Sequence, residues 1–164
     1  MASKARTVDI NEDVTKSLRK FRFQRRSQGH AAIVIKIDKA ALKMAVDEEY
    51  DNISIEDLVE ELPRNSPRYV MLSYELKHRD GRISFPLVLI NWAPSSSETT
   101  MMTLHASALL DFQRVAEANK TIEVRDTEEV SPRKSLTKNF YPNLSVLYPH
   151  PQYNISWTSR FYIP

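Results

Sequence analysis

A chain of 164 residues can bury one hydrophobic core but not two, and 41% hydrophobic and 27% charged residues are typical of globular proteins, so we expect one folded domain. The chain contains no cysteine, which excludes disulfides, thiolate zinc sites and cysteine nucleophiles and favours a reducing, cytosolic compartment. No apolar run approaches the ~18 residues that are needed to cross a bilayer. The net charge of +2 is divided between a tail, residues 131–164, with four basic residues and no acid, and a body that carries the remaining −2, so the body is not generically basic.

The first predicted element is a helix. Asn11 precedes two acids, as at a helix start, because a short polar side chain caps free amides and acids complement the positive end of the helix dipole. Val14, Leu18 and Phe21 then lie on one apolar face of a helix that ends near residue 22.

A strand pair and a short helix follow. Residues 31–38 are short and β-branched, as in a buried strand, and residues 42–46 are expected to pair with them. Ser54 and Asp57 resemble a capping box that opens a short helix, which Pro63 ends.

Residues 68–77 and 82–92 predict two further strands. The Asp-Gly pair that ends at Gly81 lies between them and indicates a tight hairpin, since both central residues of the favoured turn need positive φ. The second strand is apolar on both faces, which predicts helices on each side of the sheet, although Pro86 indicates a bulge or a local edge.

A long helix over residues 98–119 and a strand over residues 121–125 complete the predicted elements. The order is helix, hairpin, short helix, hairpin, long helix and strand. It predicts an α/β (α+β) domain with a mixed central sheet sandwiched between helices.

Charges are grouped along the body. A basic block contains Lys16, Arg19, Lys20, Arg22, Arg25 and Arg26, and residues 47–61 contain eight acids and no base. Opposed patches favour an oriented protein partner, and nucleic acid fits less well. The basic block is either a solvated helix face or an interface, and Phe21 and Phe23 beside Arg22 are either core or interface anchors.

No pattern of catalytic residues stands out. The four histidines are too dispersed for metal-ligand spacing, and two glycines cannot build a phosphate-binding loop. The carboxylates of residues 47–61 are expected to be solvated. We therefore expect a binding protein and not an enzyme, with no metal site.

Several segments occur in an order and spacing specific to one family. They are Leu18-Arg19-Lys20-Phe21-Arg22-Phe23, Ala31-Ala32-Ile33, Lys36-Ile37-Asp38, Ile53-Ser54, Leu58, Glu61-Leu62-Pro63, Pro67-Arg68-Tyr69, Ser73-Tyr74, Asp80-Gly81-Arg82-Ile83-Ser84-Phe85-Pro86-Leu87, Met101-Met102, Ala116-Glu117 and Glu123-Val124-Arg125-Asp126-Thr127-Glu128. Over about residues 8–129 they resemble the actin-depolymerising-factor homology fold and, within it, the glia maturation factor family.

The resemblance implies binding of the actin-related protein 2/3 complex, inhibition of its nucleation of actin branches, and dissociation of existing branches, with little binding to actin itself. It implies a monomer at the cytoplasmic, cortical actin cytoskeleton, with the nucleus as a further location, and no nucleic-acid, membrane or cofactor binding. The implied mechanism is competition, in which an actin-like wedge occupies a cleft needed by the first subunit of a new filament.

Two contact surfaces are implied. The first combines the amino-terminal basic segment with the long helix and consists of Arg19, Lys20, Arg22, Asp111 and Arg114. The second uses the hairpin tip together with the family's carboxy-terminal helix, and its residues here are His78, Arg79, Asp80 and Arg82.

Residues 130–164 depart from the family, which continues into a short helix. This tail holds five of the nine prolines and seven of the fifteen aromatic residues, with no glycine or acid, so it cannot sustain a helix. We expect a domain over residues 1–129 and a disordered tail over 130–164. The hypothesis that the tail is translated from a retained intron or an alternative last exon fails if every transcript of the locus reads through the junction.

Two other functions stay open. The first is a cofilin-like actin-binding protein that severs filaments. Ser107 lacks the lysine that such relatives usually place after it, whereas Met1-Ala2-Ser3 resembles either their phosphorylatable start or an ordinary processed terminus. The second is a scaffold whose aromatic tail binds an unrelated partner or a membrane surface.

Overall fold

The computed structural model describes residues 7–78 and 80–125. In chain order its elements are β1 (Asp9–Ile10), α1 (Glu12–Phe23), β2 (His30–Asp38), β3 (Lys43–Ile53), α2 (Ile55–Glu61), β4 (Arg68–Ser73), β5 (Leu76–Lys77), β6 (Ile83–Ser84), β7 (Leu87–Trp92), α3 (Thr99–Ala116) and β8 (Lys120–Val124). The predictions for Arg79, for Met1-Ala2-Ser3 and for the tail over residues 130–164 lie outside the described residues.

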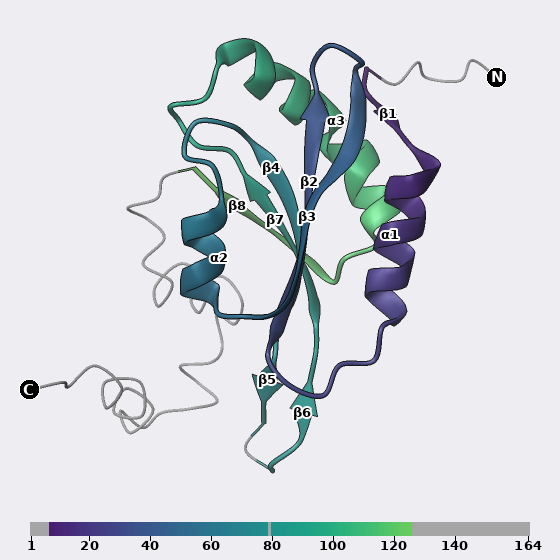
Figure 1. The fold of residues 1–164 in the computed structure, drawn as a ribbon, viewed down its shortest axis with the longest axis vertical. Coiled ribbons are helices and arrows are strands. Elements are labelled where there is room, and N and C mark those ends of the chain that lie inside the picture. Colours follow the sequence, from purple (N-terminus) through teal and green to yellow (C-terminus); the bar gives the residue numbers. More distant parts are fainter. Residues whose placement is uncertain (1–6, 79, 126–164) are drawn as a thin grey trace, which may run out of the picture.

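Six of the described strands form one mixed sheet in the order β1-β3-β2-β4-β7-β8, and β5 and β6 form a separate pair (Figure 1). The central pairings, β3 with β2, β2 with β4 and β4 with β7, are antiparallel. At the two edges, β1 runs parallel to β3 and β8 runs parallel to β7. Helices α1 and α3 lie on one side of this sheet and α2 on the other (Figure 1), which confirms the expected mixed sheet between helices.

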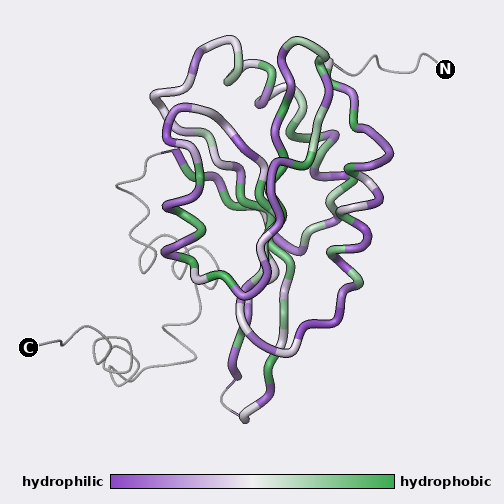
Figure 2. The backbone as a smooth tube through the Cα atoms, in the orientation of Figure 1, coloured by the Kyte–Doolittle hydropathy of each residue, from purple (hydrophilic) through white to green (hydrophobic). Residues whose placement is uncertain are grey.

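Each face of the sheet has its own hydrophobic core. In β2, Ile33 and Ile35 pack in the core beneath α1 and α3, whereas Ala32 and Val34 pack in the core beneath α2. Figure 2 shows hydrophobic residues (green) where the sheet passes between the helices and hydrophilic residues (purple) on the outer turns of α1. Burial of both faces explains why β2, β4 and β7 are almost continuously apolar in sequence.

The two shorter helices begin close to the predicted residues. Ser54 Oγ accepts a hydrogen bond from the backbone N–H of Asp57 at 3.0 Å, which confirms the cap of α2, and the helix ends at residue 61 before Pro63. α1 buries the apolar face that its periodicity predicts, but the side chain of Asn11 makes no capping hydrogen bond. The amino-terminal end of α1 is instead stabilised by the acids of its first turn, Glu12 and Asp13, which complement the positive end of the helix dipole.

β3 extends well beyond the strand expected from its sequence and contains a β-bulge. Val34 pairs with Glu48 but Ile35 pairs with Val46, so Asp47 is an extra residue with no partner position on β2. The bulge reverses the alternation of side chains along β3. Met44 and Val46, before the bulge, face the core beneath α1, and Glu48, after it, lies opposite Val34 on the α2 face.

The strands predicted over residues 68–77 and 82–92 are each broken in two. β4 and β7 stay in the main sheet, and β5 and β6 continue beyond it as a separate arm (Figure 1). The break lies at Pro86, whose carbonyl oxygen accepts a hydrogen bond from the N–H of Tyr74 at 3.0 Å. A proline without an N–H interrupts the ladder there, as its position in the sequence indicates.

The turn of the arm is one residue longer than the predicted two-residue turn. The N–H of His78 donates to the carbonyl oxygen of Arg82 at 2.8 Å, and the N–H of Gly81 donates to that of His78 at 3.0 Å. Gly81 has φ of +84°, the left-handed position that a three-residue hairpin loop assigns to glycine.

α3 is slightly shorter than predicted, β8 has the predicted length but begins one residue earlier, and β1 was not predicted. The left-handed residue Glu117, with φ of +47°, ends α3, and its N–H donates to the carbonyl oxygen of Gln113. β1 pairs only Asp9 and Ile10 with β3, and two residues are too few for a periodic signal.

Candidate protein interaction surfaces

Arg19 and Lys20 are exposed on α1, and neither pairs with a carboxylate of residues 7–78 or 80–125. Adjacent helix residues point in different directions, whereas Arg19 and Arg22 are three apart and lie on neighbouring positions of one side. The predicted first surface therefore spreads around the outer face of α1. Two of its cations are available to a partner.

Arg22 is positioned differently. Its guanidinium forms an ion pair with Glu117, 95 residues away at the end of α3, and lies over the ring of Phe23 at 5.5 Å. Its side chain is only 21% exposed. Arg22 joins α1 to the carboxy-terminal end of α3, so it holds the two helices of the predicted surface together.

Arg26 also has a structural position. Its guanidinium lies over the ring of Phe21 at 4.2 Å, donates to that residue's carbonyl oxygen at 3.2 Å, and pairs with Asp51 at 3.2 Å. Phe21 is buried in the core, whereas Phe23 is 71% exposed. The basic block thus contains both fold-stabilising arginines and free cations, and only Phe23 of the two phenylalanines is a candidate anchor.

The outer face of α3 carries little charge. Asp111 and Arg114 are the only charged residues of this helix, and they form an ion pair at 3.4 Å. The neighbouring Leu110 is 64% exposed, while Phe112 on the opposite face is fully buried. An exposed leucine beside a compact ion pair is a suitable contact for a partner protein.

The predicted second surface is the tip of the β5–β6 arm, which projects from one end of the sheet (Figure 1). Asp80 accepts hydrogen bonds from the N–H and the Nε of Arg82, at 3.1 and 2.6 Å, and these lower the pKa of its carboxyl. His78 Nε2 lies 2.8 Å from Ser84 Oγ across the arm. These three predicted residues share one tip, and hydrogen bonds within the arm hold their side chains.

The sequence indicated no role for His105, which lies in the core under α3. Its ring stacks on Tyr69 with 3.9 Å between ring centroids, and its Nε2 donates to Asn91 Oδ1 at 2.5 Å because an amide oxygen can only accept. Burial, with Arg68 nearby, lowers the pKa of His105 to about 4. The hydroxyl of Tyr69 donates to the backbone carbonyl of His105. This is a satisfied core histidine.

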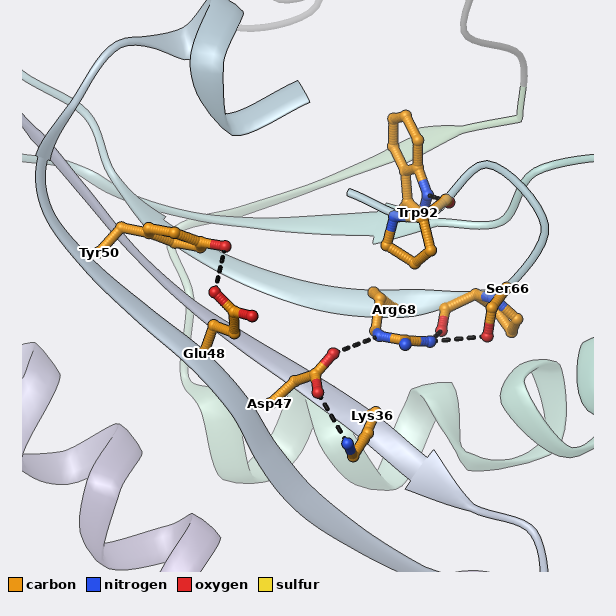
Figure 3. A network of polar contacts seen from close by, with 9 residues as sticks. Lys36, Asp47, Glu48, Tyr50, Ser66, Arg68 and Trp92 are labelled. Carbon is orange, nitrogen blue, oxygen red and sulfur yellow. Dashed lines mark hydrogen bonds and ion pairs between the residues drawn. The ribbon is translucent and has the colours of Figure 1, made fainter. Parts of the chain in front are cut away.

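A polar network lies on the α2 face of the sheet (Figure 3). Asp47, the bulge residue, accepts from Arg68 Nε and from Lys36 Nζ, both at 2.8 Å. Burial opposes ionisation of Asp47, but the hydrogen bonds from these two cations outweigh it and lower its pKa. Asp47 was expected to be solvated, and its side chain is only 22% exposed.

Residues 7–78 and 80–125 contain no group of three or more His, Cys, Asp or Glu side chains placed to hold a metal ion. No helix in the described part of the chain is long and apolar enough to cross a membrane.

A family model described as "Cofilin/tropomyosin-type actin-binding protein" matches residues 7–138. Human "Glia maturation factor beta" is 38% identical over 123 residues, which cover 75% of this chain and 86% of that protein. The chain belongs to the glia maturation factor group of this actin-binding family. Drosophila melanogaster "Glia maturation factor" is 33% identical over 123 residues, covering 75% of this chain and 88% of that protein.

A solved glia maturation factor structure supports the same assignment. The solution structure from Caenorhabditis elegans superposes with a TM-score of 0.68 at 32% identity, over 84% of this chain and 98% of that chain. The family is one of actin-binding regulators. α1, α3 and the arm, which carry the predicted surfaces, all lie within the matched range.

Proposed function

We propose that this protein binds the actin-related protein 2/3 complex, inhibits its nucleation of actin branches, and promotes dissociation of existing branches. It acts as a cytoplasmic monomer on cortical actin. Membership of the glia maturation factor group supports a regulatory role on the actin cytoskeleton. The binding of the actin-related protein 2/3 complex, the inhibition of nucleation and the dissociation of branches are what we propose beyond that role.

The observation that carries the proposal is the outer face formed by α1 and α3. It combines the uncommitted cations Arg19 and Lys20 with the exposed apolar side chains Phe23 and Leu110. Apolar anchors with nearby charge are typical of specific protein interfaces, where the charges orient the partner and the anchors supply most of the binding energy. The ion pair of Arg22 with Glu117 holds this face in one arrangement.

The arm supports a second contact. Its tip projects from the sheet on two short strands (Figure 1). In this proposal the tip contacts a second subunit of the complex. Occupation of the nucleation cleft by the first face blocks a new filament. A second contact made by the arm then strains an existing branch.

The alternative is a cofilin-like protein that binds and severs actin filaments, and the family description supports actin binding in general. The composition of α3 argues against this alternative. Ala108, which follows Ser107, is buried, so this position cannot present a cation to solvent. Arg114 is then the only cation on α3, which disfavours a filament contact that depends on a basic helix.

The deciding experiment is a quantitative pull-down of the purified actin-related protein 2/3 complex by the full chain, with actin filaments assayed in parallel. The test variant is Arg19→Ala/Lys20→Ala, which removes two exposed cations that hold no ion pair in the described structure. The matched control is Arg64→Ala/Arg125→Ala, which removes the same charge away from α1 and α3. Arg22 is left intact because its loss also cuts the link to Glu117.

We expect the parent and the control to bind the complex and ignore filaments, and the test variant to bind at least about tenfold more weakly. Binding to filaments alone would transfer the protein to the severing class. Binding to neither partner, or equal weakening in the test and control variants, would contradict the proposal.

A further inference from the structure

The β5–β6 arm leaves the main sheet at a junction that also holds the start of β2. Backbone pairing between β2 and β4 ends at Ala31 and Ser73, and the chain after Ser73 continues into the arm. The segment that leads into β2 lies at the same end of the sheet as the arm (Figure 1). Contacts at this junction therefore influence the direction in which the arm projects.

A side chain continues the hydrogen-bond ladder where the backbone pairing stops. The N–H of Tyr74 donates to the carbonyl oxygen of Pro86, on the β7 side, at 3.0 Å. The next N–H, that of Glu75, donates to Nδ1 of His30, on the β2 side, at 2.9 Å. The imidazole thus takes the place of a backbone carbonyl oxygen in an antiparallel ladder.

A second hydrogen bond runs in the opposite direction. The N–H of Gly29 donates to the carboxylate of Glu75, which also pairs with Lys77 at 3.3 Å and is only 12% exposed. The ring of His30 stacks on that of Tyr74, with 4.7 Å between the ring centroids. We call this set of two hydrogen bonds and one ring stack the junction latch.

Gly29 allows the close packing at this point. Its φ is +76°, in the left-handed region that favours glycine, and a Cβ there would collide with Oδ1 of Asn52 on β3. Asn52 also has a positive φ, of +55°. Segments from β2, β3 and the base of the arm therefore meet closely at the junction latch.

His30 can accept the hydrogen bond only as a neutral ring. A ring nitrogen that accepts carries no proton, so the single proton of the ring is on Nε2. Burial lowers the pKa of His30 and outweighs Glu75 and Glu56, which raise it, while Lys77 lowers it further. The neutral form that the junction latch needs is therefore the form present at neutral pH.

Protonation of His30 would open the junction latch. Nδ1 would become a donor that faces another donor, the N–H of Glu75. The charged ring would also be attracted to the carboxylate of Glu75 and would compete with Gly29 for it. On the neighbouring strand β3, Asp51 is already paired with Arg26. Both hydrogen bonds of the junction latch would thus be lost together.

We propose that His30 is a positioning residue that fixes the direction of the arm, and that the arm tip is presented correctly to a partner only while the junction latch is closed. His78, Asp80 and Arg82 are carried on that tip, so a change of angle at its base displaces all three. The identity of the partner rests on the proposed function, whereas the direction of the arm does not.

The absence of cysteine allows the arm to be located with a pair of spin labels on the full chain. Ile83→Cys places one label on the arm and Ala106→Cys places the other on α3, and both positions are exposed. Pulsed electron resonance measures their separation. A fixed arm gives a narrow distribution of distances, and a released arm gives a broad or displaced one.

Two variants separate the acceptor from the ring. His30→Phe keeps a ring on Tyr74 but cannot accept from Glu75, whereas His30→Asn keeps an acceptor at the position of Nδ1 and does not titrate. At pH 7.5 we expect a narrow distribution in the parent and in His30→Asn and a broad one in His30→Phe. As the pH falls to 5, the parent should broaden with a midpoint below 6.5, and His30→Asn should stay narrow.

The pH series on the parent needs no substitution at the junction, so it decides the proposal even if circular dichroism shows that His30→Phe is unfolded. A narrow distribution in a folded His30→Phe would overturn the proposal. A parent that broadens in acid no more than His30→Asn would also overturn it.

The rate of branch loss, measured on unlabelled chains by fluorescence microscopy, connects the junction latch to the proposed function. We expect His30→Phe to dissociate branches several-fold more slowly than the parent and His30→Asn, with unchanged affinity for the actin-related protein 2/3 complex. Equal rates in all three proteins would overturn the positioning role. A parent that dissociates no branches would contradict the proposed function, and the distances would then decide the junction latch by themselves.

Discussion

His105 and Tyr69 stack between α3 and β4, and both are buried in the core beneath α3. The neutral imidazole of His105 donates its Nε2–H to Asn91. Protonation of the ring would place a positive charge among apolar neighbours and close to Arg68. At the scale of a residue, the core therefore depends on a histidine that stays neutral.

We predict that the free energy of unfolding depends on pH through His105. Its pKa is about 4 in the fold against an ordinary value of 6.5 in the unfolded chain, so between these limits the unfolded chain binds more protons. The stabilisation is complete above pH 6.5 and falls by about 3 kcal/mol as the pH drops to 4. Urea denaturation over this range checks it.

The control is His105→Phe, which keeps a ring on Tyr69 but cannot titrate. Its free energy of unfolding should depend less steeply on pH between 6.5 and 4 than that of the parent. Identical slopes in the two proteins would show that His105 does not contribute. Carboxylates that titrate at the lower end affect both proteins alike, so the difference isolates the histidine.

At the scale of an element, the bulge in β3 decides where its acids point. Asp47 is the extra residue, and it links Lys36 on β2 to Arg68 on β4 across the α2 face. Arg68 is only 15% exposed and also donates to Ser66 Oγ at 2.7 Å. A cation so placed needs its carboxylate.

We predict that Asp47→Asn lowers the free energy of unfolding by about 2 kcal/mol, because a nearly buried Arg68 loses its ion pair. Glu49→Gln, on the same strand but exposed and without a cation partner in the described residues, should change it by less than about 0.5 kcal/mol. Urea midpoints of the two variants, measured side by side, test the difference. Equal losses would contradict a special role for the bulge.

At the scale of the whole molecule, the predicted surfaces lie on different parts of the fold. The α1–α3 face covers one side of the main sheet, and the arm extends from the end of that sheet (Figure 1). A partner of several subunits can thus be contacted at two places at once. Under the proposed function, we therefore expect binding and branch dissociation to be separable steps.

The double variant Asp80→Ala/Arg82→Ala tests this separation. Both side chains are largely exposed and pair only with each other in the described structure, so we expect the variant to keep the stability of the parent. We expect unchanged affinity for the actin-related protein 2/3 complex in the pull-down and a several-fold lower rate of branch loss, counted by fluorescence microscopy. Loss of affinity together with branch dissociation would show that the arm belongs to the primary contact.

The sequence by itself determined the order and type of nearly every element, because periodicity, the Ser54 cap, Pro63 and the Asp-Gly turn act over a few residues. It also indicated which family the chain belongs to and which cations are candidates for contact. The short β1, the β3 bulge and the separate arm were not predicted, since they arise from pairing between strands and leave little local signal.

Only the tertiary structure decided which members of the basic block are free. Arg22 and Arg26 are committed to Glu117 and Asp51, whereas Arg19 and Lys20 face solvent without a described partner. The carboxylate that holds Arg22 is 95 residues away, and no pattern within one helix can indicate it. The role of a charge depends on what the fold brings next to it, and that is set by packing between distant segments.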